Sequence, residues 1–472
     1  MDLTQVTGWG TLGSLLWALY LVVLSGWIVL QKRPPLSTLA WILSLAALPV
    51  IGFLIYFFLG PQKIRRQRLR RQRLRRFTHC EARAAPELEA GLRRRKQSLS
   101  RLIEKASGAP VASASQIDLL VDGEDTFQAL LQAIKTAERH VHLLYYVFET
   151  DSVGQAVMEA LRQAAERGVQ VRLLVDAVGS PSMRGRQLRQ LRKAGIEVAR
   201  FHPFRLATLR PLLNLRNHRK IAVIDGQVGF AGGINISEEQ RSSARRAGWH
   251  DLHLRLQGPI VGWLQGVFAE DWLYVTRRPL AEDQLYPQMT PGALSAQVVA
   301  SGPDSDSETI HRAYLQAIGD ARERVWLVTP YFSPGEPALY ALSNAAMRGL
   351  DVRLLLPSRS DWRVVAACAR SYYDELLARG VKIFEYQPRM LHAKALLVDD
   401  DCSLVGSANF DLRSFRLNFE VAVVVYEPSF ATQLAAQLTA DFAQSRRIGQ
   451  PRKLSWLDRL GEAAARLLSP LL

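Results

Sequence analysis

The sequence predicts an α/β protein in which two tandem α/β/α sandwich domains form a pseudo-two-fold pair, preceded by an N-terminal transmembrane helical hairpin. Two observations predict this: long uncharged stretches within the first 60 residues, and a sequence repeat in the rest of the chain. Of the 472 residues, 48% are hydrophobic, which excludes a disordered chain and suffices for two or three folded units.

Residues 1–60 carry two apolar stretches, roughly 12–30 and 36–59, separated by the short polar loop QKRPP. Because about 20 helical residues cross the hydrocarbon layer of a bilayer, both stretches are long enough to span it. A signal peptide is the alternative, but its first residues would be basic, whereas this chain begins Met1-Asp2. We therefore predict a transmembrane hairpin here.

A basic run follows the second stretch, with nine Lys and Arg residues and no acidic residue between Lys63 and Arg76. Such a flank stays in the cytoplasm, which predicts a multi-pass membrane protein whose folded domains are cytoplasmic. The run can also bind anionic lipid headgroups, or it is a plain stop-transfer flank. We interpret residues 61–114 as a basic helical connector.

The repeat defines the two domains. Residues 141–176 resemble residues 325–357, and the string RGVQVRLL from Arg167 matches RGLDVRLL from Arg348. Each copy contains an apolar run, a helical stretch that ends at Gly, and a second apolar run, an order typical of parallel strands in an α/β layer structure. A boundary in the Pro- and Gly-containing stretch 287–302 predicts domains at 115–290 and 291–448.

Residues 449–472 form an amphipathic tail. Its apolar side chains fall near one helical face: Leu454, Trp456, Leu457, Leu460, Ala464, Leu467 and Leu468. Docking on a membrane surface and packing on the protein's own core are both open interpretations.

The pattern His-x-Lys-x-x-x-x-Asp occurs twice, at equivalent places in the two domains. Its members are His218, Lys220 and Asp225, and His392, Lys394 and Asp399. One such pattern arises by chance only about a hundredth of a time in a chain of this composition. If the motifs are strands, each His and Lys project to the same side, so two imidazoles and two ammonium groups meet in one space.

This set of side chains suits phosphodiester chemistry. One His can attack phosphorus, the other can protonate the departing oxygen, and the lysines can neutralise the non-bridging oxygens. Since the lysines supply the positive charge, we predict neither a metal ion nor another cofactor. The three cysteines, Cys80, Cys368 and Cys402, are too widely spaced for a Cys-x-x-Cys metal site, and no phosphate-binding Gly-x4-Gly-Lys-Ser/Thr loop occurs.

Small residues and an amide follow each motif and would let the chain approach a phosphate. They are Gly232, Gly233 and Asn235 in the first domain, and Gly406, Ser407 and Asn409 in the second. Taken alone, such strings are more often tight turns.

Two acidic residues recur after the motifs, Asp251 and Glu420. We predict that they accept hydrogen bonds from the motif histidines and orient them, the alternative being ordinary surface or salt-bridge roles. Asp225 and Asp399 belong to the catalytic motifs, but they fall on the opposite parity of the strands. They are therefore more plausible as turn or salt-bridge residues than as direct participants.

The sequence resembles the phospholipase D superfamily and, more narrowly, bacterial cardiolipin synthases of the phospholipase D type. The resemblance covers nearly the whole chain and rests on NHRKIAVIDG with GGINI, PYF, HAKALLVDD with GSANFDLRSFRLNFE, and the closing RLLSPLL. The sequence departs from the family at GGINISEEQ and at His250, where members commonly have Arg.

The resemblance implies a location in the bacterial inner membrane and a ping-pong reaction. His218 would take the phosphatidyl group from one phosphatidylglycerol, while His392 would protonate the departing glycerol and then activate a second phosphatidylglycerol. The product would be cardiolipin.

Two alternatives remain. One is a hydrolase of the same fold, either a phospholipase D or a membrane-tethered nuclease, in which water is the acceptor. The other is a non-catalytic scaffold that binds anionic lipid. The membrane hairpin favours a lipid partner, so no nucleic acid is expected. The sequence does not predict the oligomeric state.

Overall fold

The computed structural model describes residues 3–31, 35–48, 52, 56, 94–202, 215–241, 247–280, 282–304, 307–449 and 451–469. Most of the second apolar stretch beyond residue 48, the basic run and Cys80 lie outside these residues. The chain divides into two compact units, one comprising Met1–Lys63 and Arg205–Asn214, the other the remaining residues.

The N-terminal unit contains helices α1 (Leu3–Val29) and α2 (Pro35–Ala47). Ile28, Leu45 and Tyr56 form a small buried cluster between them. Several large apolar side chains of α1 from residue 15 onward, such as Leu15 and Val22, are exposed. Among the described residues, no helix combines the length and the apolar character needed to cross a bilayer.

The first domain is built on a seven-stranded mixed sheet with the order β2-β9-β8-β7-β3-β4-β5. Its strands are β2 (Gln116–Val121), β3 (His140–Tyr145), β4 (Gln170–Asp176), β5 (Glu197–Phe201), β7 (Lys220–Ile224), β8 (Val228–Gly232) and β9 (Leu252–Gln257). Its helices are α7 (Asp122–Lys135), α8 (Ser152–Glu166), α9 (Arg186–Lys193) and α10 (Ile260–Thr276), with short 3-10 turns η3 (Glu238–Gln240) and η4 (Asp283–Leu285).

The second domain is built on a ten-stranded sheet with the order β1-β10-β18-β16-β15-β11-β13-β14-β19, and β6 also pairs with β18. Its strands are β1 (Ala112–Ala114), β6 (Arg216–Asn217), β10 (Leu294–Ser301), β11 (Arg324–Val328), β13 (Asp351–Pro357), β14 (Lys382–Tyr386), β15 (Ala395–Val398), β16 (Cys402–Gly406), β18 (Asn418–Val425) and β19 (Ser445–Arg447). A separate two-stranded pair consists of β12 (Phe332–Ser333) and β17 (Phe410–Asp411).

Helix α6 (Arg94–Ser107) precedes the first domain in the sequence. The helices of the second domain are α11 (Thr309–Asp320), α12 (Gly335–Met347), α13 (Arg363–Arg370), α14 (Tyr373–Ala378), α15 (Leu412–Arg416), α16 (Pro428–Ala443) and α17 (Trp456–Leu467). Helix α6 packs on α11, and β1 pairs with β10. The end of the segment that the sequence suggested as a connector is therefore joined to the second domain.

The internal repeat is present in the topology. Seven strands follow one another in the same order in both sheets, β2-β9-β8-β7-β3-β4-β5 corresponding to β10-β18-β16-β15-β11-β13-β14. The predicted parallel strand–helix–strand unit is confirmed by the pairing of β3 with β4 and of β11 with β13. The strands β7 and β15, which follow the motif histidines, are instead antiparallel to β3 and β11, so both sheets are mixed.

The matching Arg-Gly turns have a shared role. Gly168 and Gly349 end α8 and α12 at positive φ angles of 87° and 89°, which glycine adopts without strain. The preceding Arg167 and Arg348 donate hydrogen bonds to the terminal carbonyl groups of α7 and α11 or of the residues that follow those helices. The repeated sequence thus closes the same helix pair in each domain.

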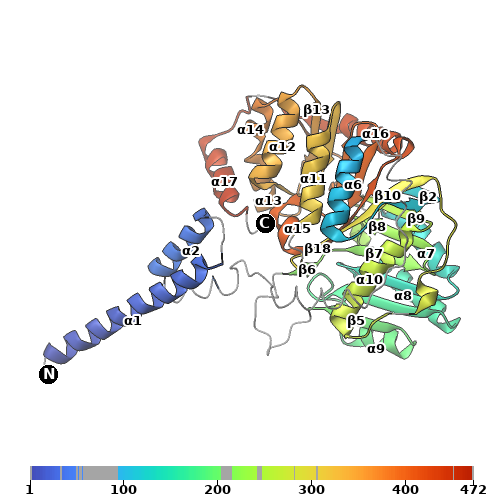
Figure 1. Ribbon diagram of the computed structural model, residues 1–472, viewed down its shortest axis with the longest axis horizontal. Coiled ribbons are helices and arrows are strands. Elements are labelled where there is room, and N and C mark those ends of the chain that lie inside the picture. Colours follow the sequence, from blue (N-terminus) through green and yellow to red (C-terminus); the bar gives the residue numbers. More distant parts are fainter. Residues whose placement is uncertain are drawn as a thin grey trace. The chain divides into compact units, whose positions relative to one another are not determined.

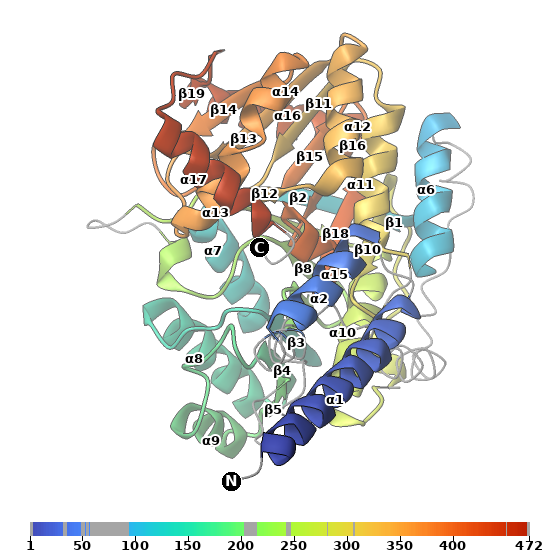
Figure 2. The same ribbon diagram turned by 90° about the vertical axis from the view of Figure 1, so that its left-hand side faces the viewer.

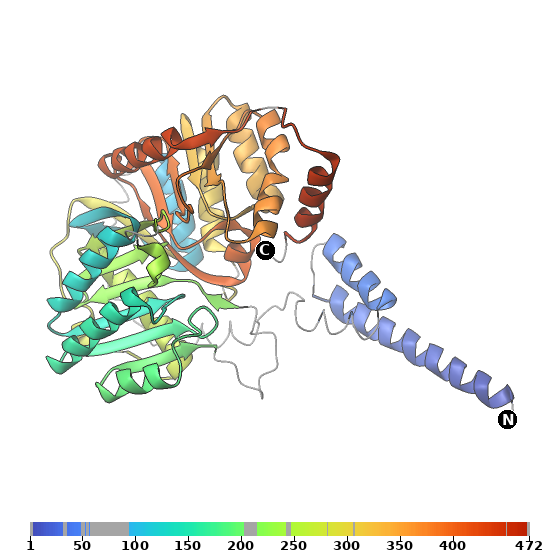
Figure 3. The ribbon, with the colours of Figure 1, turned by 180° about the vertical axis from the view of Figure 1, so that it is seen from behind.

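Three apolar layers hold the two domains together. Helices α7 and α8 cover the outer face of the first sheet, and α11 and α12 cover that of the second, each with its own buried cluster (Figures 1 and 2). The inner faces share one core, to which α10 contributes Phe268 and Trp272 and α16 contributes Leu434 and Leu438. Figure 3 shows α16, in red at the upper left, beside the second sheet and above the teal helices of the first domain.

Candidate active site

Each motif histidine is fixed by the backbone of the other domain. The amide of His218 donates to Phe419 O at 2.9 Å, next to the short β6–β18 pairing. The amide of His392 donates to His250 O at 2.7 Å. Because these contacts cross the domain boundary in both directions, the two motifs meet at one place between the sheets, as the sequence analysis predicted.

Each motif histidine pairs with an acidic residue of the other domain. Glu420 of the second domain lies 3.0 Å from Nδ1 of His218 with both carboxylate oxygens. Asp251 of the first domain lies 2.5 Å from Nδ1 of His392. Glu420 and Asp251 are fully buried. In each pair the carboxylate occupies Nδ1, so Nε2 is the nitrogen left for a substrate.

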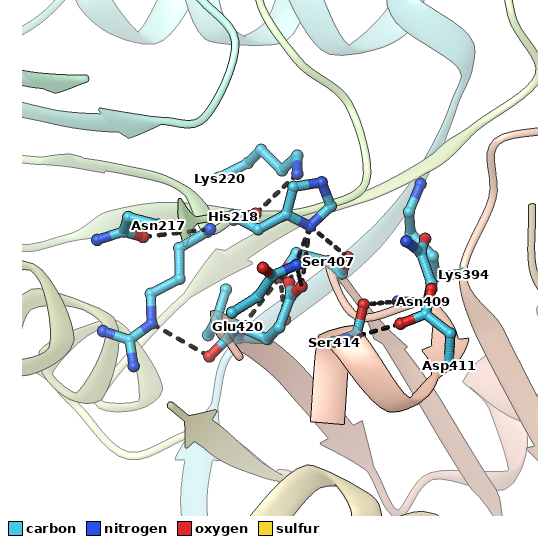
Figure 4. A network of polar contacts seen from close by, with 12 residues as sticks. Asn217, His218, Lys220, Lys394, Ser407, Asn409, Asp411, Ser414 and Glu420 are labelled. Carbon is cyan, nitrogen blue, oxygen red and sulfur yellow. Dashed lines mark hydrogen bonds and ion pairs between the residues drawn. The ribbon is translucent and has the colours of Figure 1, made fainter. Parts of the chain in front are cut away.

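Both motif lysines lie beside their histidines, at the starts of β7 and β15. Lys220 Nζ donates to His218 O at 2.7 Å, and Lys394 Nζ lies 2.8 Å from His392 Nδ1 and 3.6 Å from Asp251 Oδ2. Figure 4 shows Lys220 beside the His218 imidazole, with Lys394 approaching from the second domain. The sequence expectation that His and Lys project together is met, although each His precedes the strand itself.

Burial and, for Lys220, a nearby positive charge weaken the charge of these lysines. Burial and the charge of Lys394 lower the pKa of Lys220 to about 7, although Glu420 opposes the shift. Burial also lowers the pKa of Lys394 to about 8, against the effects of Asp251 and Glu420. An anionic phosphate placed between the two ammonium groups would relieve this repulsion, so the site favours an anion.

The lowered pKa values make the neutral form of both motif histidines predominant at pH 7. Burial lowers the pKa of His218, although Glu420 opposes the shift. Burial and Lys394 lower the pKa of His392 to about 4, although Asp251 opposes the shift. A neutral imidazole is the form that can act as a nucleophile, and the same form can accept a proton.

The small residues after the motifs make room for the acids. A Cβ atom at Gly233 would overlap the Asp251 carboxylate, and one at Gly232 would lie 2.6 Å from the His253 Cα atom. In the second domain Ser407 replaces the second glycine. Its hydroxyl donates to Glu420 Oε2 at 2.5 Å, and its carbonyl oxygen lies 3.1 Å from His218 Nδ1.

The two motif-associated asparagines are buried near the site. Asn235 Oδ1 accepts a hydrogen bond from Val147 N at 3.3 Å. The backbone amide of Asn409 donates to Ser414 Oγ at 3.2 Å, and its side-chain oxygen has no partner among the described residues. Gly406 ends β16 where a Cβ would lie 2.5 Å from Val421 O. Figure 4 shows Asn409 and Ser414 beside Lys394.

Asp225 and Asp399 do not contact the histidines. Asp225 adopts a positive φ of 53° and accepts hydrogen bonds from the amides of Glu138, Arg139 and His140. Asp399 has a φ of 55° and accepts from the corresponding amides that precede β11. Each carboxylate thus holds the entry to a central strand, as turn residues do.

Several site residues were missed by sequence reasoning. The Tyr146 ring lies 4.7 Å from the His218 ring, and the Trp249 ring 4.9 Å from the His392 ring. Arg219, between His218 and Lys220, donates to Asp271 at 2.5 Å and to the carbonyl oxygen of Glu420 at 3.1 Å. Both Arg219, within the first motif, and Trp249, next to His250, could have been noticed in the sequence. Neither residue type, however, indicates by itself a contact with the other domain.

His250, where the resemblance led us to expect Arg, joins the two domains. Its Nδ1 lies 2.7 Å from Asp122 of the first domain and its Nε2 lies 3.1 Å from Asp441 of the second. Arg389 also pairs with Asp122. Burial lowers the pKa of His250, but the hydrogen bonds to the two carboxylates outweigh it and raise the pKa to about 9. The imidazolium thus provides the cation that Arg would provide.

We expect His250→Ala to destabilise the folded protein by about 3 kcal/mol near neutral pH, because two buried carboxylates lose their shared cation. A raised pKa stabilises the folded state fully below the unfolded value of about 6.5, and this stabilisation is lost as the pH rises through about 9. The difference in unfolding temperature between wild type and variant should therefore shrink from pH 6.5 to pH 9.5.

The matched control is His250→Arg, which keeps a permanent cation. It should retain most of the stability and remove this part of the pH dependence. An equal loss in His250→Ala at both pH values would contradict the assigned charge.

Among the described residues, no group of three His, Cys, Asp or Glu side chains is placed to hold a metal ion. Cys368 and Cys402 are buried free thiols.

The chain matches two family models. Residues 130–272 and 314–445 match the family described as "Cardiolipin synthase, PLD-like domain", and residues 13–61 match "Phospholipase_D-nuclease N-terminal". The first model covers more than half of the chain and both motif regions.

Full-length relatives and a solved structure agree with this match. Cardiolipin synthase 1 of Bacillus anthracis is 37% identical over 98% of this chain and 94% of its own length. Cardiolipin synthase of Geobacillus kaustophilus is 39% identical over 94% and 91%. The fold is similar to that of phosphatidylserine synthase from Haemophilus influenzae, with a TM-score of 0.59 and 16% identity over 79% of this chain and all of the other. With two equivalent domains, paired motifs and relatives of this similarity along nearly its whole length, the chain belongs to the cardiolipin synthase family of proteins with PLD-like domains.

Proposed function

We propose that this protein transfers a phosphatidyl group between two phosphatidylglycerol molecules, giving cardiolipin and glycerol. The observation that carries the proposal is the exchanged pairing of His218 with Glu420 and of His392 with Asp251, around two buried lysines. Relatives named cardiolipin synthase match this chain over nearly their whole length. We infer the chemical roles of the individual residues from this geometry and from the sequence resemblance.

In the first step, Nε2 of neutral His218 attacks phosphorus and the bond to the glycerol headgroup breaks. His392, protonated at Nε2, gives its proton to the departing glycerol oxygen, and the phosphatidyl group remains on His218. Because burial and Lys394 hold the pKa of His392 at about 4, the substrate itself must assist this protonation. A bound phosphodiester anion does so, because it offsets the charge of Lys220 and Lys394 that disfavours an imidazolium.

In the second step, His392 removes a proton from a hydroxyl group of the second phosphatidylglycerol. That oxygen attacks phosphorus, and His218 departs as a neutral imidazole. One phosphodiester replaces another, so the reaction needs no nucleotide. Asp251 and Glu420 keep the Nδ1 positions of the two rings occupied throughout and so hold each Nε2 toward phosphorus.

The lysines bind the non-bridging phosphate oxygens in this proposal. We expect Lys220→Met or Lys394→Met to lower kcat by about 10²–10³-fold, the usual effect of removing one positioned donor. A lysine is charged below its pKa, so kcat/KM should fall as the pH rises past about 7 to 8, where both ammonium groups lose their protons in the free enzyme. A pH profile of kcat/KM that stays flat to pH 10 would contradict this role.

Incubation of the protein with labelled phosphatidylglycerol tests the function directly. Cardiolipin and free glycerol in equal amounts support transfer. Phosphatidic acid as the main product would instead support the alternative, a phospholipase D-type hydrolase, and cleavage of nucleic acid without lipid turnover would support a membrane-tethered nuclease. Adding phosphatidylethanolamine as the only donor defines the headgroup preference.

We also propose that the N-terminal unit anchors the protein in the bacterial inner membrane as a transmembrane hairpin, with the catalytic domains in the cytoplasm. Support comes from the uncharged stretches and the following basic run. Large apolar side chains along α1 and α2 are also exposed, as expected for a surface that contacts lipid. Labelling of single cysteines placed in the QKRPP loop and after residue 61, from outside intact cells, tests this topology: only the loop should react.

A further inference from the structure

The C-terminal helix α17 borders a large cavity that contains none of the motif residues. The cavity has a volume of about 1360 Å³ and lies between α13, α17 and the end of β19. Its place in the second domain separates it from the chemistry of His218 and His392.

Helix α17 is held on the domain by polar contacts and by one buried small residue. Arg452, which precedes it, pairs with Asp374 of α14 at 2.7 Å and with Glu462 of α17 at 2.8 Å. Arg466 stacks on the Tyr372 ring at 4.2 Å, and Ala465 is buried. These contacts lie on the side of the helix that faces the protein, and the larger apolar side chains of α17 take no part in them.

Those apolar side chains are exposed. Trp456, Leu457, Leu460 and Leu467 of α17 are 58–82% exposed, and Trp362, next to α13, is 65% exposed. The sequence analysis left open whether this tail packs on the core or on a membrane. The structure shows a helix that packs on the protein through one side only, so that its Trp and Leu side chains form an apolar ridge.

More cationic than acidic side chains line the cavity beside this ridge. Arg370 and Arg446 pair with Glu385, and Arg452 with Glu462, while Asp458 accepts from Ser455 at 2.7 Å. Among the described residues, the other four cations of the lining have no acidic partner: Arg359, Arg363, Arg447 and Lys453. Every lining carboxylate is therefore already engaged, and a positive surplus faces the cavity.

We propose that the surface made by α13 and α17 binds a bilayer that contains anionic phospholipid. The four unpaired cations contact phosphate groups, and the Trp and Leu ridge enters the interface beside them. This pairing of an apolar ridge with a cationic border is the one that amphipathic helices use at membrane surfaces, where Trp is favoured and each nearby cation adds attraction to anionic lipid. The charge surplus favours this occupant over a second copy of this positively charged chain.

The test uses the full chain with Cys80→Ser and Leu460→Cys, labelled with the environment-sensitive fluorophore NBD. The remaining cysteines, Cys368 and Cys402, are buried. The labelled protein is reconstituted in vesicles of phosphatidylcholine alone or mixed with phosphatidylserine. The mixed vesicles should increase the emission by about twofold or more and shift it to the blue, as expected for a probe that enters the interface. The same label on Gln433→Cys, at an exposed position of α16, should not respond.

Charge variants separate this surface from a general attraction of the protein to anionic lipid. Arg359→Gln/Arg363→Gln/Lys453→Gln should remove most of the gain at position 460. The matched variant Arg186→Gln/Arg189→Gln/Lys193→Gln, which removes the same charge from α9, should retain it. Unchanged unfolding temperatures show that both are folded. Equal losses in both variants, equal emission in the two kinds of vesicle, or a blue shift that instead follows protein concentration through self-association would each overturn the proposal.

Discussion

Replacing His218 by Ala is expected to lower phosphatidyl transfer by about 10⁴–10⁶-fold, the range seen when a catalytic nucleophile is removed. His392, oriented by Asp251 at 2.5 Å, has the role of acid and base in the proposed reaction and so does not replace the nucleophile. Rapid acid-free quenching of wild-type protein with radiolabelled phosphatidylglycerol should trap lipid on the chain, and the variant should trap none. A covalent lipid adduct that persists in His218→Ala would reassign the nucleophile.

The companion variant, His392→Ala, separates the two steps of the reaction. With phosphatidylglycerol it should be nearly inactive, because the departing glycerol oxygen receives no proton. With a phosphatidyl ester of p-nitrophenol the first step needs no acid, since the leaving group is already stable as an anion. The variant should then release one burst of p-nitrophenol and accumulate the His218 adduct. Wild-type turnover with phosphatidylglycerol would remove His392 from the mechanism.

The second large effect is expected on replacing Glu420 or Asp251, because each of these acids should act on the motif histidine of the other domain. Glu420→Gln should slow the p-nitrophenol burst by about 10²–10⁴-fold, since the amide no longer favours the tautomer of His218 that leaves Nε2 unprotonated. Asp251→Asn should leave the burst largely intact and slow steady-state turnover by a similar factor, because it acts on His392.

The distinction between these two variants tests the crossed arrangement itself. If each acid served the histidine of its own domain, Asp251→Asn would slow the burst and Glu420→Gln would spare it. Asp401→Asn is the matched control. Asp401 is also a buried carboxylate, and its cationic partner, Lys96 at 3.1 Å, is not a residue of either motif. Losses of burst rate in Asp401→Asn equal to those in Glu420→Gln would indicate a general effect on folding.

Much of the architecture was predictable because it is encoded locally. The apolar runs from Val141 and Val325 form the central strands β3 and β11, since continuous β-branched and aliphatic residues suit strands buried on both faces. The glycines that follow Arg167 and Arg348 end helices, since they adopt the left-handed conformation at little cost. Such signals depend on neighbouring residues in the sequence, and their occurrence in both copies of the repeat supports the same prediction twice.

The arrangement of the site was less predictable. The sequence indicated that Asp251 and Glu420 orient the histidines, but it contained no signal that the partners are exchanged between domains. It placed Asp225 and Asp399 within the catalytic motifs, whereas their carboxylates hold the backbone before β3 and β11. The antiparallel pairing of β7 and β15 was also not foreseen, because strand direction depends on contacts between segments far apart in the chain.

The sequence by itself determined the class of protein: paired His-x-Lys motifs in a duplicated α/β chain allow few chemistries, because these side chains and their spacing are themselves the chemical requirement. Only the tertiary structure decided which carboxylate serves which imidazole, that His250 joins the domains as a buried cation, and that α17 exposes its apolar ridge beside unpaired arginines. These properties arise from burial and from distances between atoms that lie more than 100 residues apart in the chain, and no local pattern of residues encodes them.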